Sequence, residues 1–193
     1  MKIAIIKYNA GNIRSVDYGL RRLGIEPLLT DDHEVIRKSD KVIFPGVGEA
    51  GSTMRYLKER KLDILIRDLT QPVLGICLGL QLLCAHSEES DTSCIGIFDV
   101  PVNKFPAGDK VPHMGWNKIF VNSRKIFPDQ VNNKYVYFVH SYYAPVGLYT
   151  SAVTEYIIPF SAALEKDNFF ATQFHPEKSG DIGELILKRF VEL

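Results

Sequence analysis

The first half of the chain alternates short apolar runs with stretches in which apolar residues recur at helical spacing. The runs predict strands, and the i, i+3, i+4, i+7 spacing predicts amphipathic helices between them. A break in phase after Leu57 leaves open whether the third helix is one helix or two. In chain order, the predicted strands cover residues 3–7, 27–30, 41–44 and 72–77, and the predicted helices cover residues 12–23 and 52–69. Residues 31–37 are predicted as a short polar helix or a turn.

The second half has a different pattern, in which runs rich in Val, Ile, Phe and Tyr are separated by turn residues. Such runs predict mostly antiparallel strands, and a final amphipathic helix follows them. The strands are predicted over residues 94–102, 118–121, 135–139, 150–154 and 169–174, and the helix over residues 181–193. Alternating strands and helices favour a sheet covered on both faces. We therefore predict one α/β domain over residues 1–193, flavodoxin-like and three-layered, with a mostly parallel central sheet and an added antiparallel region.

Composition narrows the class of protein. The 193 residues carry no formal net charge, whereas nucleic-acid binders usually have a basic surplus. No apolar stretch approaches the roughly 20 residues that cross a bilayer, and residues 1–7 are too short for a signal peptide. The cysteine count is three, with no Cys-x-x-Cys pair, which does not resemble a disulfide framework or a zinc ribbon. We expect a cytoplasmic protein with neither nucleic-acid nor membrane partners.

The most informative motif lies at the end of the predicted strand over residues 72–77. Glycines stand two positions before and two positions after Cys77, and a Leu-rich stretch ending at His86 follows. This order is typical of a sharp strand-to-helix turn that exposes a nucleophile. The positive end of the helix dipole favours a thiolate there. Cys84 on the Leu-rich helix and Cys94 at a strand start keep the ordinary interpretation of cysteine as a small core residue.

His175 and Glu177 form a second candidate for chemistry. Their spacing places both on one face of a continuing strand, although Pro176 between them favours a strand end. A histidine can take up a thiol proton, and a carboxylate can orient its ring. His-x-Glu also opens a zinc-deaminase signature, but the Pro-Cys-x-x-Cys that must follow is missing. We therefore predict a Cys-His-Glu site with Cys77 and expect no metal.

A glycine-rich segment follows the strand predicted over residues 41–44. Gly46, Gly48 and Gly51 match the dinucleotide-binding pattern G-x-G-x-x-G. That pattern requires an acidic residue at the end of the next strand, where this chain has Cys77. The better interpretation is that the segment brings a backbone N–H to a developing oxyanion. We expect no dinucleotide and no other cofactor.

Three more segments are predicted at strand ends, the edge where open α/β sheets bind ligands. Residues 9–12 follow the first strand, and residues 140–143 follow the apolar strand of residues 135–139. Residues 113–117 hold the only tryptophan, Trp116, and a packed turn is the alternative for them. Each segment is a weak signal alone, and their joint placement favours a ligand site.

Three motifs stand in order along the chain: Pro45-Gly46-Val47-Gly48, Gly75-Ile76-Cys77-Leu78-Gly79-Leu80-Gln81 and Gln173-Phe174-His175-Pro176-Glu177. With them the chain resembles the class I glutamine amidotransferases over essentially its whole length. Further segments narrow the resemblance to glutaminase subunits that serve histidine biosynthesis, and these are residues 8–16, 112–117, 137–142 and 178–179. The fold and the candidate triad expected from the residues agree with this resemblance.

The resemblance implies roles for individual residues. Cys77 would attack the carboxamide of glutamine, His175 would move the protons, and Glu177 would orient His175. The oxyanion would be held by the amide of Leu78 and by an amide of the segment Val47-Gly48. Substrate contacts are implied for Gln81, Glu89, His140, Ser141 and Tyr142. The role of Glu89 depends on the register of residues 87–93, whereas the triad does not.

The resemblance also implies a partner. Such glutaminases dock on a separate (β/α)₈ cyclase, as a heterodimer, and pass ammonia through its barrel. Residues expected near the docking face are Asn12, Trp116, Tyr137 and Lys178. No segment of this chain is long enough to be that cyclase, so we expect it on another chain. The alternatives are an amidotransferase for another acceptor, a catalytically silent interaction protein of the same fold, and a cysteine peptidase.

Overall fold

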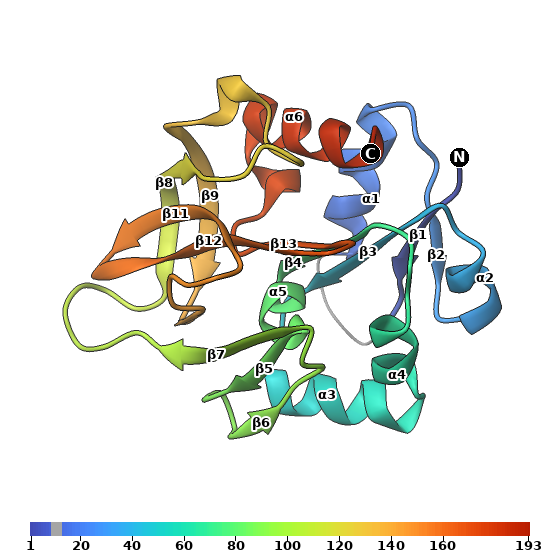
Figure 1. Cartoon of the computed structure of the whole chain (residues 1–193), viewed down its shortest axis with the longest axis horizontal. Coiled ribbons are helices and arrows are strands. Elements are labelled where there is room, and N and C mark those ends of the chain that lie inside the picture. The colour runs from blue at the N-terminus through green and yellow to red at the C-terminus, as the bar shows by residue number, and fades with distance from the viewer. Residues whose placement is uncertain (9–12) are drawn as a thin grey trace.

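The computed structural model describes residues 1–8 and 13–193 (Figure 1). The first half alternates strands and helices as the apolar periodicity predicts. Its elements are β1 (Ile3–Ile6), α1 (Ile13–Arg22), β2 (Leu28–Thr30), α2 (His33–Arg37), β3 (Lys41–Gly46), α3 (Ala50–Glu59), α4 (Leu62–Arg67), β4 (Val73–Cys77) and α5 (Leu78–Leu83). The phase break after Leu57 is the boundary between two helices, α3 and α4.

The second half is mostly strand. Its elements are β5 (Cys84–Ser87), β6 (Thr92–Ser93), β7 (Phe98–Lys104), β8 (His113–Val121), η1 (Asp129–Val131), β9 (Lys134–His140), β10 (Tyr142–Tyr143), β11 (Thr150–Tyr156), β12 (Ile158–Lys166), β13 (Phe169–Thr172), η2 (Pro176–Lys178) and α6 (Gly180–Val191). A small sheet of order β10-β7-β5-β6 lies beside the main one.

Nine strands of the described residues form the main sheet, in the order β2-β1-β3-β4-β13-β12-β11-β8-β9. The pairings from β2 to β13 are parallel, and those from β13 to β9 are antiparallel. The predicted α/β class, with a parallel region extended by antiparallel strands, is confirmed. The C-terminal ends of β3, β4 and β13 lie side by side, and the segments carrying the predicted motifs start there.

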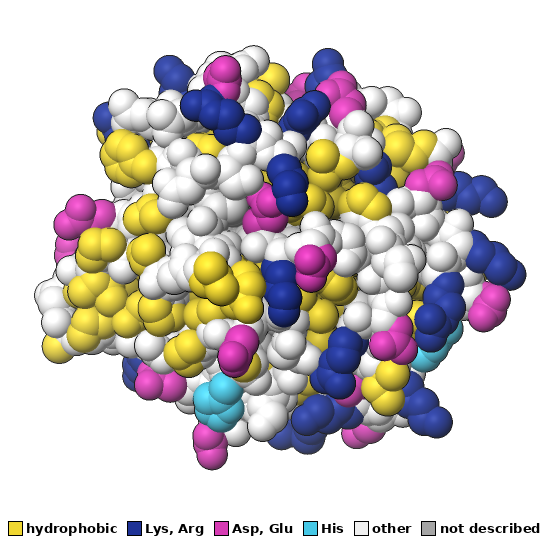
Figure 2. Space-filling view, in the orientation of Figure 1, with side chains coloured by type: hydrophobic (Ala, Val, Ile, Leu, Met, Phe, Trp, Pro, Cys, Tyr) yellow, Lys and Arg dark blue, Asp and Glu magenta, His cyan; other side chains and the backbone are white. Residues whose placement is uncertain are grey.

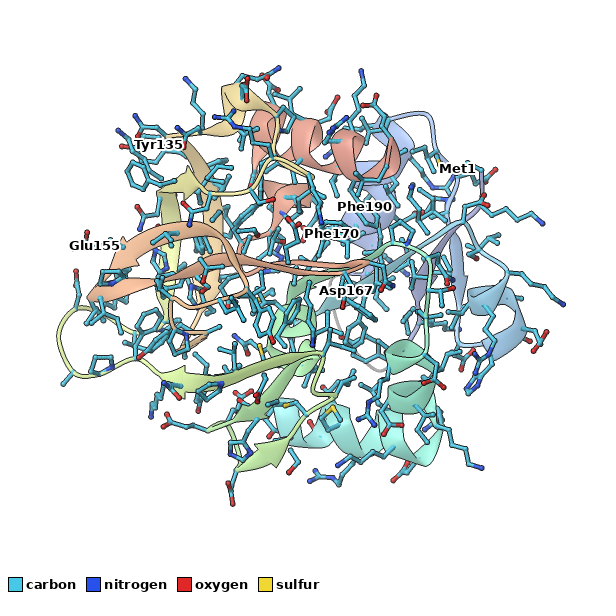
Figure 3. All side chains as sticks on the ribbon, in the orientation of Figure 1. Met1, Tyr135, Glu155, Asp167, Phe170 and Phe190 are labelled. Carbon is cyan, nitrogen blue, oxygen red and sulfur yellow. The ribbon has the colours of Figure 1, made fainter. Side chains whose placement is uncertain are left out.

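Helices cover both faces of the sheet, with α1 and α6 on one side and α3, α4 and α5 on the other (Figure 1). The side chains of β1 alternate between two hydrophobic cores, one on each face of the sheet. Ile3 and Ile5 belong to the core under α1 and α6. Ala4 and Ile6 join the core on the opposite face. In the first of these cores, Phe170 of β13 and Phe190 of α6 make an edge-on contact with ring centroids 6.3 Å apart (Figure 3).

Two predicted boundaries are wrong. The helix after Cys77 ends at Leu83, so Cys84 and His86 lie on β5 rather than on that helix. Cys94 lies outside β7, which begins at Phe98. In the first place β5 of the small sheet replaces the end of the predicted helix, and in the second residues 94–97 form no strand.

Strand β12 was not predicted at all, although it lies between β11 and β13. Its centre is Ser161, Ala162 and Ala163, residue types that rarely favour strands, and Pro159 stands near its start. Tertiary pairing on both sides outweighs this local preference. Among the described residues, no helix is long and apolar enough to span a membrane. Figure 2 shows acidic and basic side chains interspersed over the visible face.

Candidate active site

Cys77 is the last residue of β4 and the residue that precedes α5. Its backbone has φ 55° and ψ −106°, a strained conformation for a residue with a side chain. The turn closes only because Gly79 packs directly on β3, where a Cβ would overlap the carbonyl oxygen of Phe44. Gly75 is similarly confined, since a Cβ would lie 2.8 Å from Leu83 Cδ1. The predicted sharp strand-to-helix turn at Cys77 (the elbow) is thus present in the structure.

His175 and Glu177 reach the elbow from the segment after β13. Both are buried, and His175 Nδ1 lies 2.7 Å from Glu177 Oε1. Strand β13 ends at Thr172 and η2 begins at Pro176, so the proline marks the end of the strand. The turn of η2 allows the carboxylate to fold back onto the ring that precedes it by two residues.

The imidazole of His175 also contacts Cys77. Burial opposes its protonation, but hydrogen bonding to the Cys77 thiol group and to Glu177 outweighs burial and raises the pKa of His175. The Cys77 sulfur additionally lies 3.8 Å from the carbonyl oxygen of Val139 on β9. Cys77 and the distant pair of His175 and Glu177 therefore form a connected Cys-His-Glu arrangement. Such an arrangement can act as a thiol nucleophile with an oriented general base.

A pocket of about 290 Å³ opens in front of Cys77. The predicted residues that line it, besides Cys77, are Val47, Gly48, Leu78, Gln81, Glu89, His140, Ser141 and Tyr142. Pro112 and Val139 also line it and were not predicted. His175 and Glu177 lie behind the cysteine, away from the pocket lining.

The glycine-rich segment borders this pocket between β3 and α3. Gly48 has φ +138°, a region that side chains disfavour, and its neighbourhood leaves room for a Cβ. The start of the segment is held by Tyr8, whose hydroxyl donates to the carbonyl oxygen of Pro45. Its end is held by Glu49, which accepts from the amides of Gly51 and Ser52 and so caps α3. The backbone between these two anchors is the predicted oxyanion segment.

Gln173 was not assigned a role from the sequence, yet it is fully buried beside the nucleophile. Its Nε2 lies 3.8 Å from Cys77 Sγ, and its Oε1 accepts from Gln81 Nε2 at 3.1 Å. Gln81 Nε2 also donates to the carbonyl oxygen of Tyr142 at 3.0 Å. The only signal in the sequence was its position two residues before His175.

His140 of the pocket wall pairs with a second buried histidine, His113. His140 Nδ1 lies 2.7 Å from the carbonyl oxygen of Tyr142, which only accepts, so this nitrogen carries the proton. His140 Nε2 then accepts from His113 Nδ1 at 3.1 Å. Burial lowers the pKa of His113 to about 4 and that of His140 to about 3. Both rings are therefore neutral near pH 7.

The family of the chain follows from a comparison with known proteins. The family model described as "Glutamine amidotransferase class-I" matches residues 5–193. The chain belongs to the class-I glutamine amidotransferases. The three motifs that carry the resemblance lie at the elbow, the glycine-rich segment and the His-Glu turn of this structure.

Curated members of the amidotransferase family are similar to the chain over its full length. An "Imidazole glycerol phosphate synthase subunit HisH" of Bacteroides thetaiotaomicron is 60% identical, with 100% of both chains covered. The protein of the same name from Pectobacterium atrosepticum is 47% identical, again with 100% of both covered.

Solved structures of other proteins share the fold. A putative GMP synthase subunit from Thermoplasma acidophilum has a TM-score of 0.75 and 23% identity, covering 100% of this chain and 92% of that one. PurLQS from Thermotoga maritima has a TM-score of 0.73 and 17% identity, covering 99% and 97%. At such identities, the likeness concerns the fold alone.

Glu89 lies in the hairpin between β5 and β6, on the rim of the pocket of this amidotransferase. Its Oε2 accepts from the amide of Ala50 at 2.8 Å, two residues beyond Gly48. Burial raises the pKa of Glu89, the Ala50 amide opposes the rise, and the charge of Glu49 adds to it. The carboxyl group of Glu89 thus lies at the pocket with one oxygen held by the Ala50 amide.

The residues predicted for a docking face lie outside the pocket. Trp116 is 56% exposed and pairs across β8 and β9 with Tyr137, their ring centroids 6.0 Å apart. Tyr135 continues this face along β9, at the edge of the molecule (Figure 3). Lys178 is exposed in η2, and Asn12 lies outside the described residues. Among the described residues, no cluster of His, Cys, Asp and Glu could hold a metal ion.

Proposed function

We propose that this amidotransferase hydrolyses glutamine to glutamate and ammonia through a thioester on Cys77. The observation that carries the proposal is the contact of Cys77 with His175, whose Nδ1 lies 2.7 Å from Glu177, at the base of the pocket. A thiolate paired with an imidazolium attacks an amide carbon, and the histidine proton passes to the leaving nitrogen. Ammonia then departs and the acyl group remains on sulfur.

The second half of the reaction uses the same groups in reverse. His175 takes a proton from water, the resulting hydroxide attacks the thioester carbon, and the Cys77 sulfur leaves. Glu177 keeps the ring oriented and stabilises its charged form in both halves. The Leu78 amide and an amide of Val47-Gly48 would donate to the oxyanion of each tetrahedral intermediate. One such donor is worth roughly 10²–10³ in rate, so its presence or absence can switch the enzyme.

Substrate recognition is proposed for the remaining pocket residues. Glu89 would bind the α-ammonium group of glutamine by charge, in exchange for part of its contact with Ala50. The backbone of His140-Ser141-Tyr142 would face the α-carboxylate, since the His140 ring is turned inward to His113. Gln81 has both N–H groups engaged, which leaves its carbonyl oxygen to accept a hydrogen bond from the substrate.

We further propose that the chain serves as the glutaminase subunit of an imidazole glycerol phosphate synthase. Relatives that carry this subunit name are 60% and 47% identical over the whole chain. The ammonia would pass to a separate (β/α)₈ cyclase that makes imidazole glycerol phosphate and an aminoimidazole carboxamide ribotide. The exposed aromatic face around Trp116 and Tyr137, together with Lys178, would be the docking surface.

The test is glutamate release from glutamine by the purified chain, alone and with that cyclase plus its nucleotide substrate. We expect slow release alone and strong stimulation in the complex. Stimulation only by a synthase of another pathway would assign the chain to a different acceptor. No release under any of these conditions would support a silent interaction protein.

A further inference from the structure

Gln173 occupies a position that the proposed mechanism does not use. Its side chain is fully buried behind the nucleophile and does not line the pocket. Its backbone is fixed, because the Gln173 amide donates to the carbonyl oxygen of Ala162 at 2.8 Å. The side-chain amide therefore faces Cys77 and Gln81 from a rigid strand end rather than from a loop.

The orientation of this amide is determined by its neighbours. Gln81 Nε2 stands between two oxygens, the Tyr142 carbonyl at 3.0 Å and Gln173 Oε1 at 3.1 Å. Rotation of Gln81 by half a turn would bring its own oxygen against the Tyr142 carbonyl, and two acceptors repel. Gln173 must in turn present its oxygen to Gln81, which leaves its N–H groups toward the sulfur.

The Tyr142 carbonyl, on the other side of Gln81 from Gln173, is also held in place. The carbonyl of Tyr142 accepts from both Gln81 Nε2 and His140 Nδ1, which uses its two lone pairs. His140 is held by His113, and the His113 ring stacks on Tyr156 with ring centroids 4.1 Å apart. A connected set of hydrogen bonds, in which His140 and Gln81 both donate to the Tyr142 carbonyl, thus links a neutral histidine pair to the Cys77 sulfur.

We propose that Gln173 is a positioning residue for the reaction, which rests on the proposed function: its side-chain N–H donates to the Cys77 sulfur and directs it toward the substrate carbonyl. The donor stabilises the sulfur when it carries negative charge, before attack and again when it leaves the thioester. Hydrogen bonds to charged groups are the stronger ones, and one is worth about tenfold or more in such an equilibrium.

The experiment compares Gln173→Glu, Gln173→Ala and the control Gln130→Glu, an exposed glutamine in η1. Two quantities are measured: glutamine turnover in the complex with the cyclase, and the rate at which iodoacetamide alkylates Cys77, followed by peptide mass spectrometry. We expect both Gln173 variants to lose about tenfold or more in kcat, with KM within threefold, because Gln173 does not line the pocket. Cys77 alkylation should slow by a similar factor, while Gln130→Glu behaves as the unchanged protein.

A merely structural role would give a different result. Loosened packing would expose Cys77 and speed its alkylation, whereas loss of the donor slows it. Unchanged or faster alkylation in folded Gln173→Glu overturns the inference.

If the Gln173 variants do not fold, a measurement on the unchanged protein still tests the inference. Alkylating Cys77 must shift the side-chain amide proton resonances of Gln173, and their failure to respond overturns the inference. A Cys77→Ala variant that retains turnover would instead refute the proposed function, so the two failures are distinguishable.

Discussion

The backbone amide of His175 donates to the carbonyl oxygen of Tyr137, with the two atoms 2.9 Å apart. The Tyr137 amide in turn donates to Ser179 Oγ at 3.0 Å, so β9 is fastened to the turn that carries His175. On its outer face, the same strand pairs Tyr137 with the exposed Trp116. A partner that docks on this aromatic face would therefore act directly on the backbone that holds the proposed triad.

Trp116→Ala should weaken the complex with the cyclase. Large aromatic side chains at the centre of an interface commonly supply its main binding energy, so we expect at least a tenfold rise in Kd. Titration calorimetry with the two purified proteins measures it. Leu148→Ala, which removes an even more exposed apolar side chain elsewhere, is the control and should bind normally. Equal affinities for both variants would exclude this face as the docking surface.

Gly48→Ala should reduce partner-stimulated glutamine turnover by about 10²-fold, because one oxyanion donor is worth that much. The side chain has room, but φ +138° is unfavourable for alanine, so the peptide will turn away from this conformation. Steady-state kcat in the complex is the measurement. Gly96→Ala, also a positive-φ glycine with open space around it, should keep its turnover. Turnover of Gly48→Ala within threefold of the unchanged protein would argue against the segment as oxyanion donor.

The sharp turn at Cys77 could be predicted from the sequence because its geometry requires glycines, and glycines are visible in the sequence. Only glycine fits at position 79 against Phe44, and its spacing from Cys77 is visible in the sequence. The role of Gln173 could not be predicted, since a glutamine at a strand end is ordinary until its partners are known. The His113–His140 pair was missed because β8 begins at His113, five residues before the predicted start, and pairing in register with β9 brings the rings together.

Gly79→Ala tests the packing of the elbow. Its Cβ would overlap the Phe44 carbonyl oxygen, a backbone atom of a central strand that cannot easily move. We expect the free energy of unfolding to fall by about 3 kcal/mol, the upper range for overpacking. Gly147→Ala, where a Cβ meets nothing within 4 Å, should change it by less than about 0.5 kcal/mol. Urea unfolding of both variants measures these free energies. Equal stabilities would refute the close approach of position 79 to the Phe44 carbonyl oxygen.

The histidine pair predicts a pH dependence of stability. The lowered pKa values, about 4 for His113 and about 3 for His140, mean that the unfolded chain takes up protons first as the pH falls below 6.5. The stability that the neutral rings contribute is therefore present above pH 6.5 and is lost progressively toward pH 3–4. In His113→Phe this loss should be smaller, by up to about 1.4 kcal/mol per pH unit.

Urea unfolding between pH 7 and pH 5 measures that difference between the two proteins. The opposite shift of the His175 pKa is common to both proteins and cancels. Parallel profiles would show that His113 is not held neutral by burial.

The central claim is a thioester on Cys77, and acid quenching of the complex during glutamine turnover tests it most directly. Peptide mass spectrometry should find one glutamyl group on Cys77 and none on Cys84 or Cys94, and Cys77→Ala should release no glutamate above background. Sustained glutamate release by Cys77→Ala, in the complex with its cyclase, would contradict the account.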